Sequence, residues 1–89
     1  MIAKYFTFEH PDGLHLRVAA EIVKLAQTTS SRVRLVRGDD MREANAISIM
    51  DLLLLEATAG TDFHVEVDGP NEQQVLNRIE EIFGDGGGI

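Results

Sequence analysis

A histidine next to an arginine, at the start of a helix-forming run, is the combination in this chain best suited to chemistry. His15 follows the turn-forming sequence Pro11-Asp12-Gly13, and a run of helix-forming residues begins directly after it. If the helix begins at Leu16, His15 is its N-cap, where amides without helical partners create partial positive charge. Arg17 adds a permanent cation that suits phosphate. An imidazole nucleophile beside an anion-binding helix end indicates a histidine that carries a phosphoryl group; the alternative is a histidine that only caps the helix.

Ser48 is the second residue whose type and place allow chemistry. It precedes an apolar run and stands three residues before Asp51, a spacing similar to that of a capping box. A serine that caps a helix contributes about 1 kcal/mol, which is reason enough for its presence. A phosphate on the same hydroxyl would also be favourable at a helix start, although Asp51 would repel it. We favour the cap and retain Ser48 as a candidate regulatory phosphorylation site.

The segment after Ser48 has more apolar side chains than one buried helix face accommodates. Exposed apolar area beside a reactive residue indicates a surface for a protein partner. A neighbouring stripe on the side of His15 begins at Leu16. We therefore expect a docking surface from two helices, made of Leu16, Ala20, Lys24, Ile49, Met50 and Leu53. The alternative is a buried core with scattered apolar residues on the surface.

Hydrophobic periodicity predicts the elements that position these residues. Alternation with period two predicts strands over residues 2–8, 32–37, 41–44 and 62–68, with a hairpin turn at 38–40. Apolar residues at helical spacing predict helices over 16–28, over 49–56, and from Gly69-Pro70 onward with Pro70 as first helical residue. Their buried stripes should include Ala19, Ile22, Val23, Ala26, Val75, Ile79, Ile82 and Phe83.

The resulting order, βαββαβα, predicts an α+β fold. An open-faced β-sandwich satisfies it, with a four-stranded antiparallel sheet and three helices on one face. Periodicity alone equally allows a generic ferredoxin-like domain. We expect residues 1–84 to form the domain and the Gly-rich residues 85–89 to be a flexible tail.

Composition narrows the classes of function. The chain has 89 residues, enough for one modest core, and its net charge of −7 disfavours nucleic acid. It contains no cysteine, no apolar run long enough for a membrane span and no leader pattern, which favours a cytoplasmic protein. The remaining histidines, His10 and His64, form no recognisable metal-ligand spacing with Asp12. We therefore expect no metal, no cofactor, no nucleic acid and no membrane.

Several stretches of the chain resemble one bacterial family. Gly13-Leu14-His15-Leu16-Arg17 followed by small apolar residues is similar to the phosphorylation-site sequence of HPr and its nitrogen-related paralogue NPr, phosphocarriers of the bacterial phosphotransferase system. The block of residues 44–50 falls where this family has its regulatory serine region, and residues 68–72 also resemble it. The likeness covers nearly the whole chain and implies an HPr-like open-faced β-sandwich.

The resemblance also implies a role and partners. It makes the protein a phosphoryl carrier rather than an enzyme, with Nδ1 of His15 as acceptor and Arg17 stabilising the phosphate. Enzyme I, charged from phosphoenolpyruvate, is the implied donor, IIA-type proteins are the implied acceptors, and a serine kinase/phosphorylase is a further implied partner for Ser48. We expect a monomer.

One position departs from the family pattern, and two other functions stay open. The family has proline after His-x-Arg, whereas this chain has Val18, whose additional N–H either helps to hold phosphate or alters how His15 is presented. The first alternative function is a regulatory module of the same fold that docks proteins without phosphotransfer. The second is a small-molecule-binding domain that dimerises through its sheet.

Overall fold

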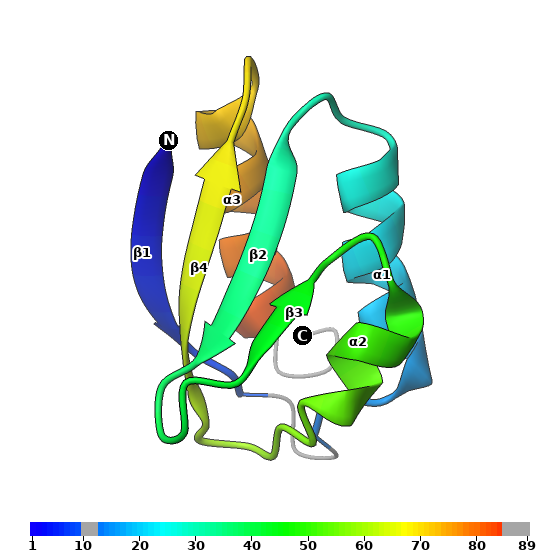
Figure 1. The fold of residues 1–89 in the computed structure, drawn as a ribbon, viewed down its shortest axis with the longest axis vertical. Helices are drawn as coiled ribbons and strands as arrows, with labels where there is room; N and C mark the ends of the chain where they lie inside the picture. The colour runs from blue at the N-terminus through cyan, green and yellow to red at the C-terminus, as the bar shows by residue number, and fades with distance from the viewer. Residues whose placement is uncertain (10–12, 85–89) are drawn as a thin grey trace.

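Four strands and three helices follow one another in the order βαββαβα (Figure 1). The computed structural model describes residues 1–9 and 13–84. The strands are β1 Ile2–Thr7, β2 Arg32–Arg37, β3 Glu43–Asn45 and β4 Asp62–Asp68. The helices are α1 Leu16–Gln27, α2 Ile49–Leu54 and α3 Glu72–Gly84. The predicted element order and the α+β class are therefore confirmed.

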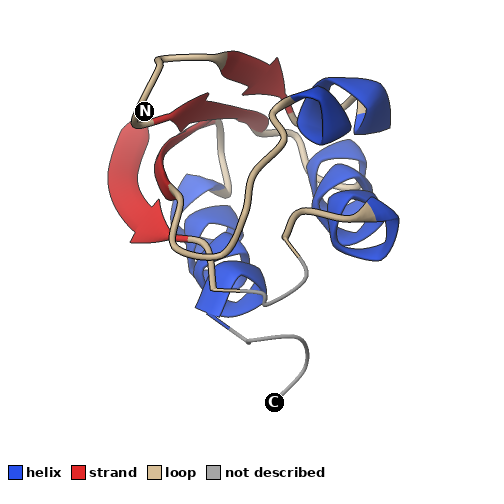
Figure 2. Cartoon of the chain, turned by 90° about the horizontal axis from the view of Figure 1, so that it is seen from below, coloured by secondary structure: helices blue, strands red, loops and turns tan. Residues whose placement is uncertain are grey.

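The strands form one antiparallel sheet in the order β1-β4-β2-β3. The inner strand β4 pairs with β1 on one side, where Phe6 lies opposite Phe63. On its other side β4 pairs with β2, where Leu35 lies opposite Val65. The three helices lie on one side of the sheet, as the view along it shows (Figure 2). The other side stays open, which confirms the predicted open-faced arrangement.

The core lies between the sheet and the helices. Every second residue of β4 from Phe63 onward is buried, and so are Val33 and Leu35 on β2, because a period-two strand places these side chains on one face. The rings of Phe8, Phe63 and Phe83 meet edge to face, with centroids 5.3–6.4 Å apart. This cluster joins the end of β1 to α3.

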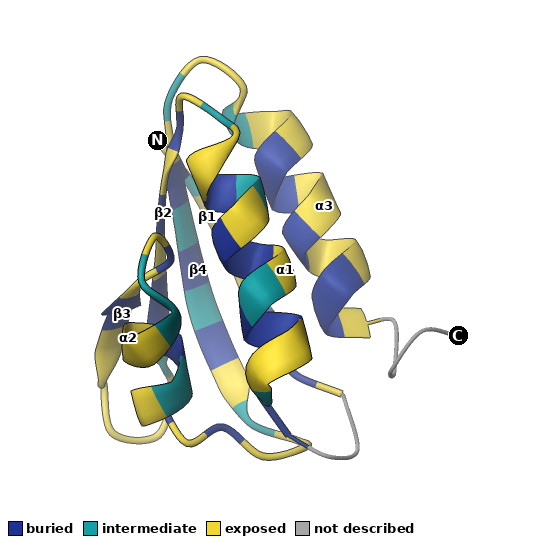
Figure 3. Cartoon of the chain, turned by 90° about the vertical axis from the view of Figure 1, so that its right-hand side faces the viewer, coloured by how far each residue is buried: buried dark blue, intermediate teal, exposed yellow. Residues whose placement is uncertain are grey.

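Helices α1 and α3 turn their apolar stripes toward the sheet and their polar faces outward (Figure 3). The predicted core residues of both stripes are buried, namely Ala19, Ile22, Val23, Ala26, Val75, Ile79, Ile82 and Phe83. Helix α1 ends where the hydroxyl of Thr28 donates to the carbonyl of Lys24 at 2.9 Å. The short hydroxyl side chain competes for the helix carbonyls, as the sequence indicates.

Two element boundaries differ from the prediction in the middle of the chain. The third strand covers Glu43–Asn45 rather than 41–44, because Met41 adopts a left-handed φ of 61° and belongs to the hairpin loop. Helix α2 ends at Leu54 rather than at Glu56, because Glu56 is also left-handed, with φ 54°. Neither residue is a glycine, so composition gave no sign of these conformations.

The predicted start of the last helix is also wrong. Pro70 lies in a turn, and α3 begins at Glu72. The amide of Glu72 donates to the carbonyl of Gly69 at 3.3 Å, while its carboxylate accepts from the Gly69 amide at 3.2 Å. These reciprocal bonds close a turn around Pro70 and delay the helix.

Some predictions fall on residues outside those that the structure describes. They concern His10, the Pro11-Asp12 part of the first turn, and the tail at 85–89. The longest helix, α3, has 13 residues. Within the described part of the chain, no helix has the length and apolar character needed to cross a membrane.

Candidate functional site

His15 is the N-cap of α1, as the sequence predicts. Its backbone is extended, with φ −96° and ψ 177°, and its carbonyl accepts the first helical bond, from Ala19 at 3.0 Å. The amides of Leu16, Arg17 and Val18 precede that first bond, so they have no partner within the helix. The half-buried His15 side chain forms no hydrogen bond to these amides. The His15 side chain therefore does not occupy the amides that could bind an anion at this helix start.

The charges around this helix start also favour an anion. The first turn of α1 has no acidic residue that would compete with a bound phosphate. Arg17 is exposed and forms no ion pair with any other residue in the described ranges. Arg17 thus lies in the first turn of α1, two residues after His15, and its guanidinium is in no ion pair with another described residue.

The loop before His15 is fixed by the segment that follows α2. The amide of Leu14 donates to the carbonyl of Ala57 at 3.0 Å. Gly13 has φ 77°, and a Cβ on it would lie 2.7 Å from the same carbonyl oxygen. Glycine is therefore required here both by its backbone angle and by the close approach of Ala57.

Val18, the residue at the position of the family proline, is part of the core. Its side chain is only 1% exposed. The side chain points inward while its amide lies in the first turn, where a proline would remove no helical bond. Val18 therefore contributes to the packing of α1 against the core.

Ser48 caps α2, which confirms the structural part of its prediction. Its Oγ accepts from the amide of Asp51 at 3.2 Å. In the turn before Ser48, the side-chain oxygen of Asn45 accepts from the amide of Ile47 at 3.2 Å. The serine is half-buried and lies at the start of the helix, so its hydroxyl already has a structural role.

The predicted docking residues come from α1 and α2, which pack against each other. On α1, Leu16 is 62% exposed, Ala20 is half-buried and Lys24 is exposed. On α2, Met50 is 64% exposed, while Ile49 and Leu53 are half-buried and pack on the core. The expected excess of apolar surface on α2 is therefore present, close to the helix start that carries His15.

Other residues of this region are not among those predicted from the sequence. Ile47 and Leu54 are also more than half exposed and extend the apolar surface. Arg37 and Arg42, from the β2–β3 hairpin, donate to the carbonyls at the end of α2. The apolar run after Ser48 was the sequence signal that could have identified Leu54. No such signal exists for the two arginines, because their contact with α2 depends on how the hairpin folds.

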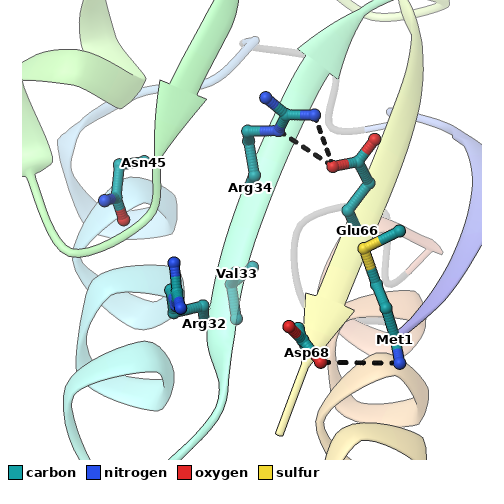
Figure 4. A pocket seen from close by; sticks show the side chains of 7 residues that line it. All are labelled: Met1, Arg32, Val33, Arg34, Asn45, Glu66 and Asp68. Carbon is teal, nitrogen blue, oxygen red and sulfur yellow. Dashed lines mark hydrogen bonds and ion pairs between the residues drawn. The ribbon is translucent and has the colours of Figure 1, made fainter.

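The open face of the sheet carries a separate pocket of about 280 Å³. Figure 4 shows its lining residues, Met1, Arg32, Val33, Arg34, Asn45, Glu66 and Asp68. Arg34 is held between Glu66 and Glu43, each at 2.6 Å, so this cation is already paired. The guanidinium pairing raises the pKa of Arg34, chiefly through its hydrogen bond to Glu66. Neither His15 nor Arg17 lines this pocket.

The structure is thus an open-faced β-sandwich with a histidine at the start of α1 and exposed apolar side chains on α1 and α2. The sequence comparisons give this class a family. The profile of the family described as the PTS HPr component phosphorylation site matches residues 2–85. The chain therefore belongs to the HPr family, the phosphocarriers of the bacterial phosphotransferase system.

Individual relatives agree with this assignment. Phosphocarrier protein HPr of Treponema pallidum (strain Nichols) is 36% identical over 83 residues, which cover 93% of this chain and 92% of the relative. Phosphocarrier protein NPr of Escherichia coli (strain K12) is 35% identical over 74 residues, covering 83% and 81%. The crystal structure of an HPr from Thermoanaerobacter tengcongensis superimposes with a TM-score of 0.88 at 25% identity, covering 100% of this chain and 98% of that one. The resemblance inferred from the sequence is thus confirmed.

Proposed function

We propose that this phosphocarrier receives a phosphoryl group on His15 from enzyme I and passes it to IIA-type acceptor proteins. The observation that carries the proposal is the place of His15 at the start of α1, where three amides have no helical partner and the exposed Arg17 belongs to the same first turn. These groups stabilise the added negative charge by about 0.3–2 kcal/mol for the helix end. Moderate stabilisation suits a carrier, because the phosphoryl group must leave again.

The transfer step is a displacement at phosphorus. The lone pair of Nδ1 of His15 forms the new N–P bond, and the bond from phosphorus to the donor's leaving group breaks, with its electron pair staying on the donor. The other ring nitrogen keeps its proton, so the transfer itself consumes and releases none. The reverse arrangement, with the acceptor as nucleophile, passes the group on. The chain supplies the nucleophile and the anion-stabilising helix start.

The docking surface brings the partners to this nucleophile. Leu16, Ala20 and Lys24 of α1, with Ile49, Met50 and Leu53 of α2, form an apolar surface edged by a cation beside His15. Burial of exposed apolar side chains such as Leu16 and Met50 would supply the contact energy. A Met50→Asp substitution should therefore weaken phosphorylation by enzyme I without unfolding the protein, since Met50 is already solvent-exposed.

Phosphorylation with purified enzyme I and phosphoenolpyruvate tests the proposal. We expect one acid-labile, base-stable phosphate per chain, seen as a mass increase, and its loss in His15→Ala. His64→Ala is the matched control and should leave the phosphate unchanged, because His64 lies on β4 and alternates with the buried Phe63 and Val65. No phosphate on the parent protein, together with retained binding to enzyme I, would favour the docking-only module.

Ser48 is a second candidate modification site of the same protein. We propose the helix cap as its main role, supported by its bond to the Asp51 amide. Incubation with an HPr-type serine kinase and ATP distinguishes the two roles. An acid-stable phosphate on the parent, absent from Ser48→Ala, would add the regulatory role to the cap.

A further inference from the structure

We propose that Arg37 is a positioning residue for phosphoryl transfer: it holds the end of α2, and through it the His15 loop, in the orientation that partners meet. The inference rests on the proposed function of His15 and the docking surface. It concerns an arginine of the β2–β3 hairpin whose side chain contacts the carbonyl of Leu55 and the carboxylates of Asp39 and Asp40.

Helix α2 has few contacts of its own to fix its orientation. It comprises only Ile49–Leu54, and Leu52 is its single buried residue. Leu54 is 59% exposed, and the helix ends in a left-handed Glu56 rather than in a glycine. A helix of this length is marginal by itself, so its position depends on contacts from neighbouring elements.

The hairpin supplies such contacts at the C-terminal end of α2. Nη1 of Arg37 donates to the carbonyl of Leu55 at 2.5 Å, and Nη1 of Arg42 donates to the carbonyl of Leu54 at 3.2 Å. Both carbonyls lie at the helix end, where the partial charge is negative and cations are favoured. We call the two arginines with Asp39 and Asp40 the hairpin clamp.

Arg37 is the more firmly held arginine of the clamp. Its Nε lies 2.8 Å from Oδ1 of Asp39, and its Nη2 donates to Oδ2 of the same carboxylate at 3.2 Å. The Arg37 side chain is only 18% exposed, against 50% for Arg42, whose Nε lies 3.4 Å from Asp40. The ion pair and the Nη2 hydrogen bond with Asp39 hold the Arg37 guanidinium on one side, while its Nη1 donates to the carbonyl of Leu55.

The clamped segment continues directly into the support of the His15 loop. Two residues after Leu55, the carbonyl of Ala57 accepts from the amide of Leu14 at 3.0 Å. The absence of a side chain on Gly13 lets that carbonyl approach the loop. The position of residues 55–57 therefore determines both where α2 ends and where the residue before His15 lies.

This connection predicts a specific kinetic defect. Phosphoryl transfer between two proteins needs the nucleophile aligned with phosphorus while the partner is docked, and a shift of about 1 Å can cost up to about 100-fold in rate. Without the Arg37 bond, α2 and the His15 loop should adopt several relative positions. The imidazole itself would be unchanged, so a small donor that needs no docking surface should react as before.

The experiment compares Arg37→Met with the parent protein, using enzyme I as one donor and phosphoramidate as the other. We expect kcat/KM with enzyme I to fall about 10–100-fold. Phosphorylation by phosphoramidate should stay within about twofold, and Arg37→Lys, which restores one cationic donor, should recover part of the loss. Arg78→Met is the matched control on α3, where the arginine pairs with Glu81 at 3.5 Å.

A stability control separates positioning from simple destabilisation. Val75→Ala removes buried volume from α3 and should lower the free energy of unfolding while leaving kcat/KM with enzyme I unchanged. An Arg37→Met protein with parental kcat/KM would overturn the proposal. So would an equal loss with phosphoramidate, because the arginine would then act on the chemistry of His15.

Amide hydrogen exchange tests the clamp independently of phosphotransfer. In Arg37→Met, the amides of Leu52, Leu55 and Leu14 should exchange faster, because their carbonyl acceptors lie in α2 or in the segments next to it. The amide of Val75 should not, because its acceptor, the carbonyl of Asn71, lies at the start of α3. If the parent protein takes no phosphate from enzyme I but Arg37→Met shows this exchange pattern relative to it, the proposed function fails and the clamp stands. Unchanged exchange at Leu55 and Leu14 would refute the clamp itself.

Discussion

The amide of Leu14 donates a hydrogen bond to the carbonyl of Ala57 at 3.0 Å, which ties the residue before His15 to the segment after α2. Gly13 lies against the same carbonyl, and a Cβ there would come within 2.7 Å of the oxygen. The site is therefore formed by two segments far apart in the chain. Its geometry depends on how closely they approach.

The first prediction concerns that approach. Gly13→Ala should lower the free energy of unfolding by at least about 2 kcal/mol, from left-handed strain plus the clash with Ala57. Gly60→Ala is the control, because Gly60 also has positive φ, at 91°, but would place its Cβ in open space. Gly60→Ala should lower the free energy of unfolding by only about 1 kcal/mol. Urea unfolding measures both, and equal losses would show that the Ala57 contact is unimportant.

Glu56 offers a route to a more stable protein. Its φ of 54° places a residue with a Cβ in the left-handed region directly after α2, while its amide donates to Leu53 at 3.2 Å. Glu56→Gly should raise the free energy of unfolding by about 0.5–1 kcal/mol, because glycine adopts this conformation without strain. Glu56→Ala tests whether loss of the charge explains the gain; a stability equal to that of Glu56→Gly would contradict the strain argument.

Asp39 should make stability depend on pH below about pH 4. Its hydrogen bond to the Arg37 guanidinium holds the pKa of the Asp39 carboxyl below its ordinary value of 3.8. A lowered folded-state pKa gives stability that is present above the unfolded value and lost as pH falls through the folded one. Urea unfolding should be measured from pH 6 to pH 2.5. At pH 6 the free energy of unfolding of the parent should exceed that of Asp39→Asn, and the two values should converge in acid. A constant difference across the range would exclude this titration.

The valine in place of the family proline should be replaceable without loss of the fold. Val18→Pro removes an amide that has no helical partner, because the first bond of α1 runs from Ala19 to His15. The free energy of unfolding should fall by less than about 1.5 kcal/mol, the range for similar apolar exchanges in a core. Val23→Pro, in the middle of the same helix, should cost about 3 kcal/mol or more. Far-UV circular dichroism with urea unfolding compares them, and similar losses would mean that residue 18 lies beyond the tolerant first turn.

The cap on α2 should contribute measurably to stability. Ser48→Ala removes the acceptor of the Asp51 amide and should lower the free energy of unfolding by about 1 kcal/mol. Ser48→Asp keeps an acceptor at the same place and should retain most of the parental stability, although its charge lies near that of Asp51. Thermal or urea unfolding gives both values. A Ser48→Ala protein as stable as the parent would leave the serine without its structural role.

The sequence predicted most where the signal was local and repeated. The strand over Asp62–Asp68 and the helix from Leu16 came from strict periods of two and 3.6, and each was confirmed at the predicted start. The third strand and the start of α3 were placed wrongly. Met41 and Pro70 belong to turns whose shape is set by backbone bonds between residues that composition does not pair.

The sequence by itself determined that His15 begins a helix with Arg17 on its first turn, because neighbours along the chain stay neighbours in the fold. It also determined that the segment after Ser48 has more apolar surface than one face can bury. Only the tertiary structure decided that Ala57 lies against Gly13 and that Arg37 meets the carbonyl of Leu55. Such contacts join residues that are distant in the chain, and they depend on the packing of hairpin, helix and loop together, which no single stretch of sequence contains.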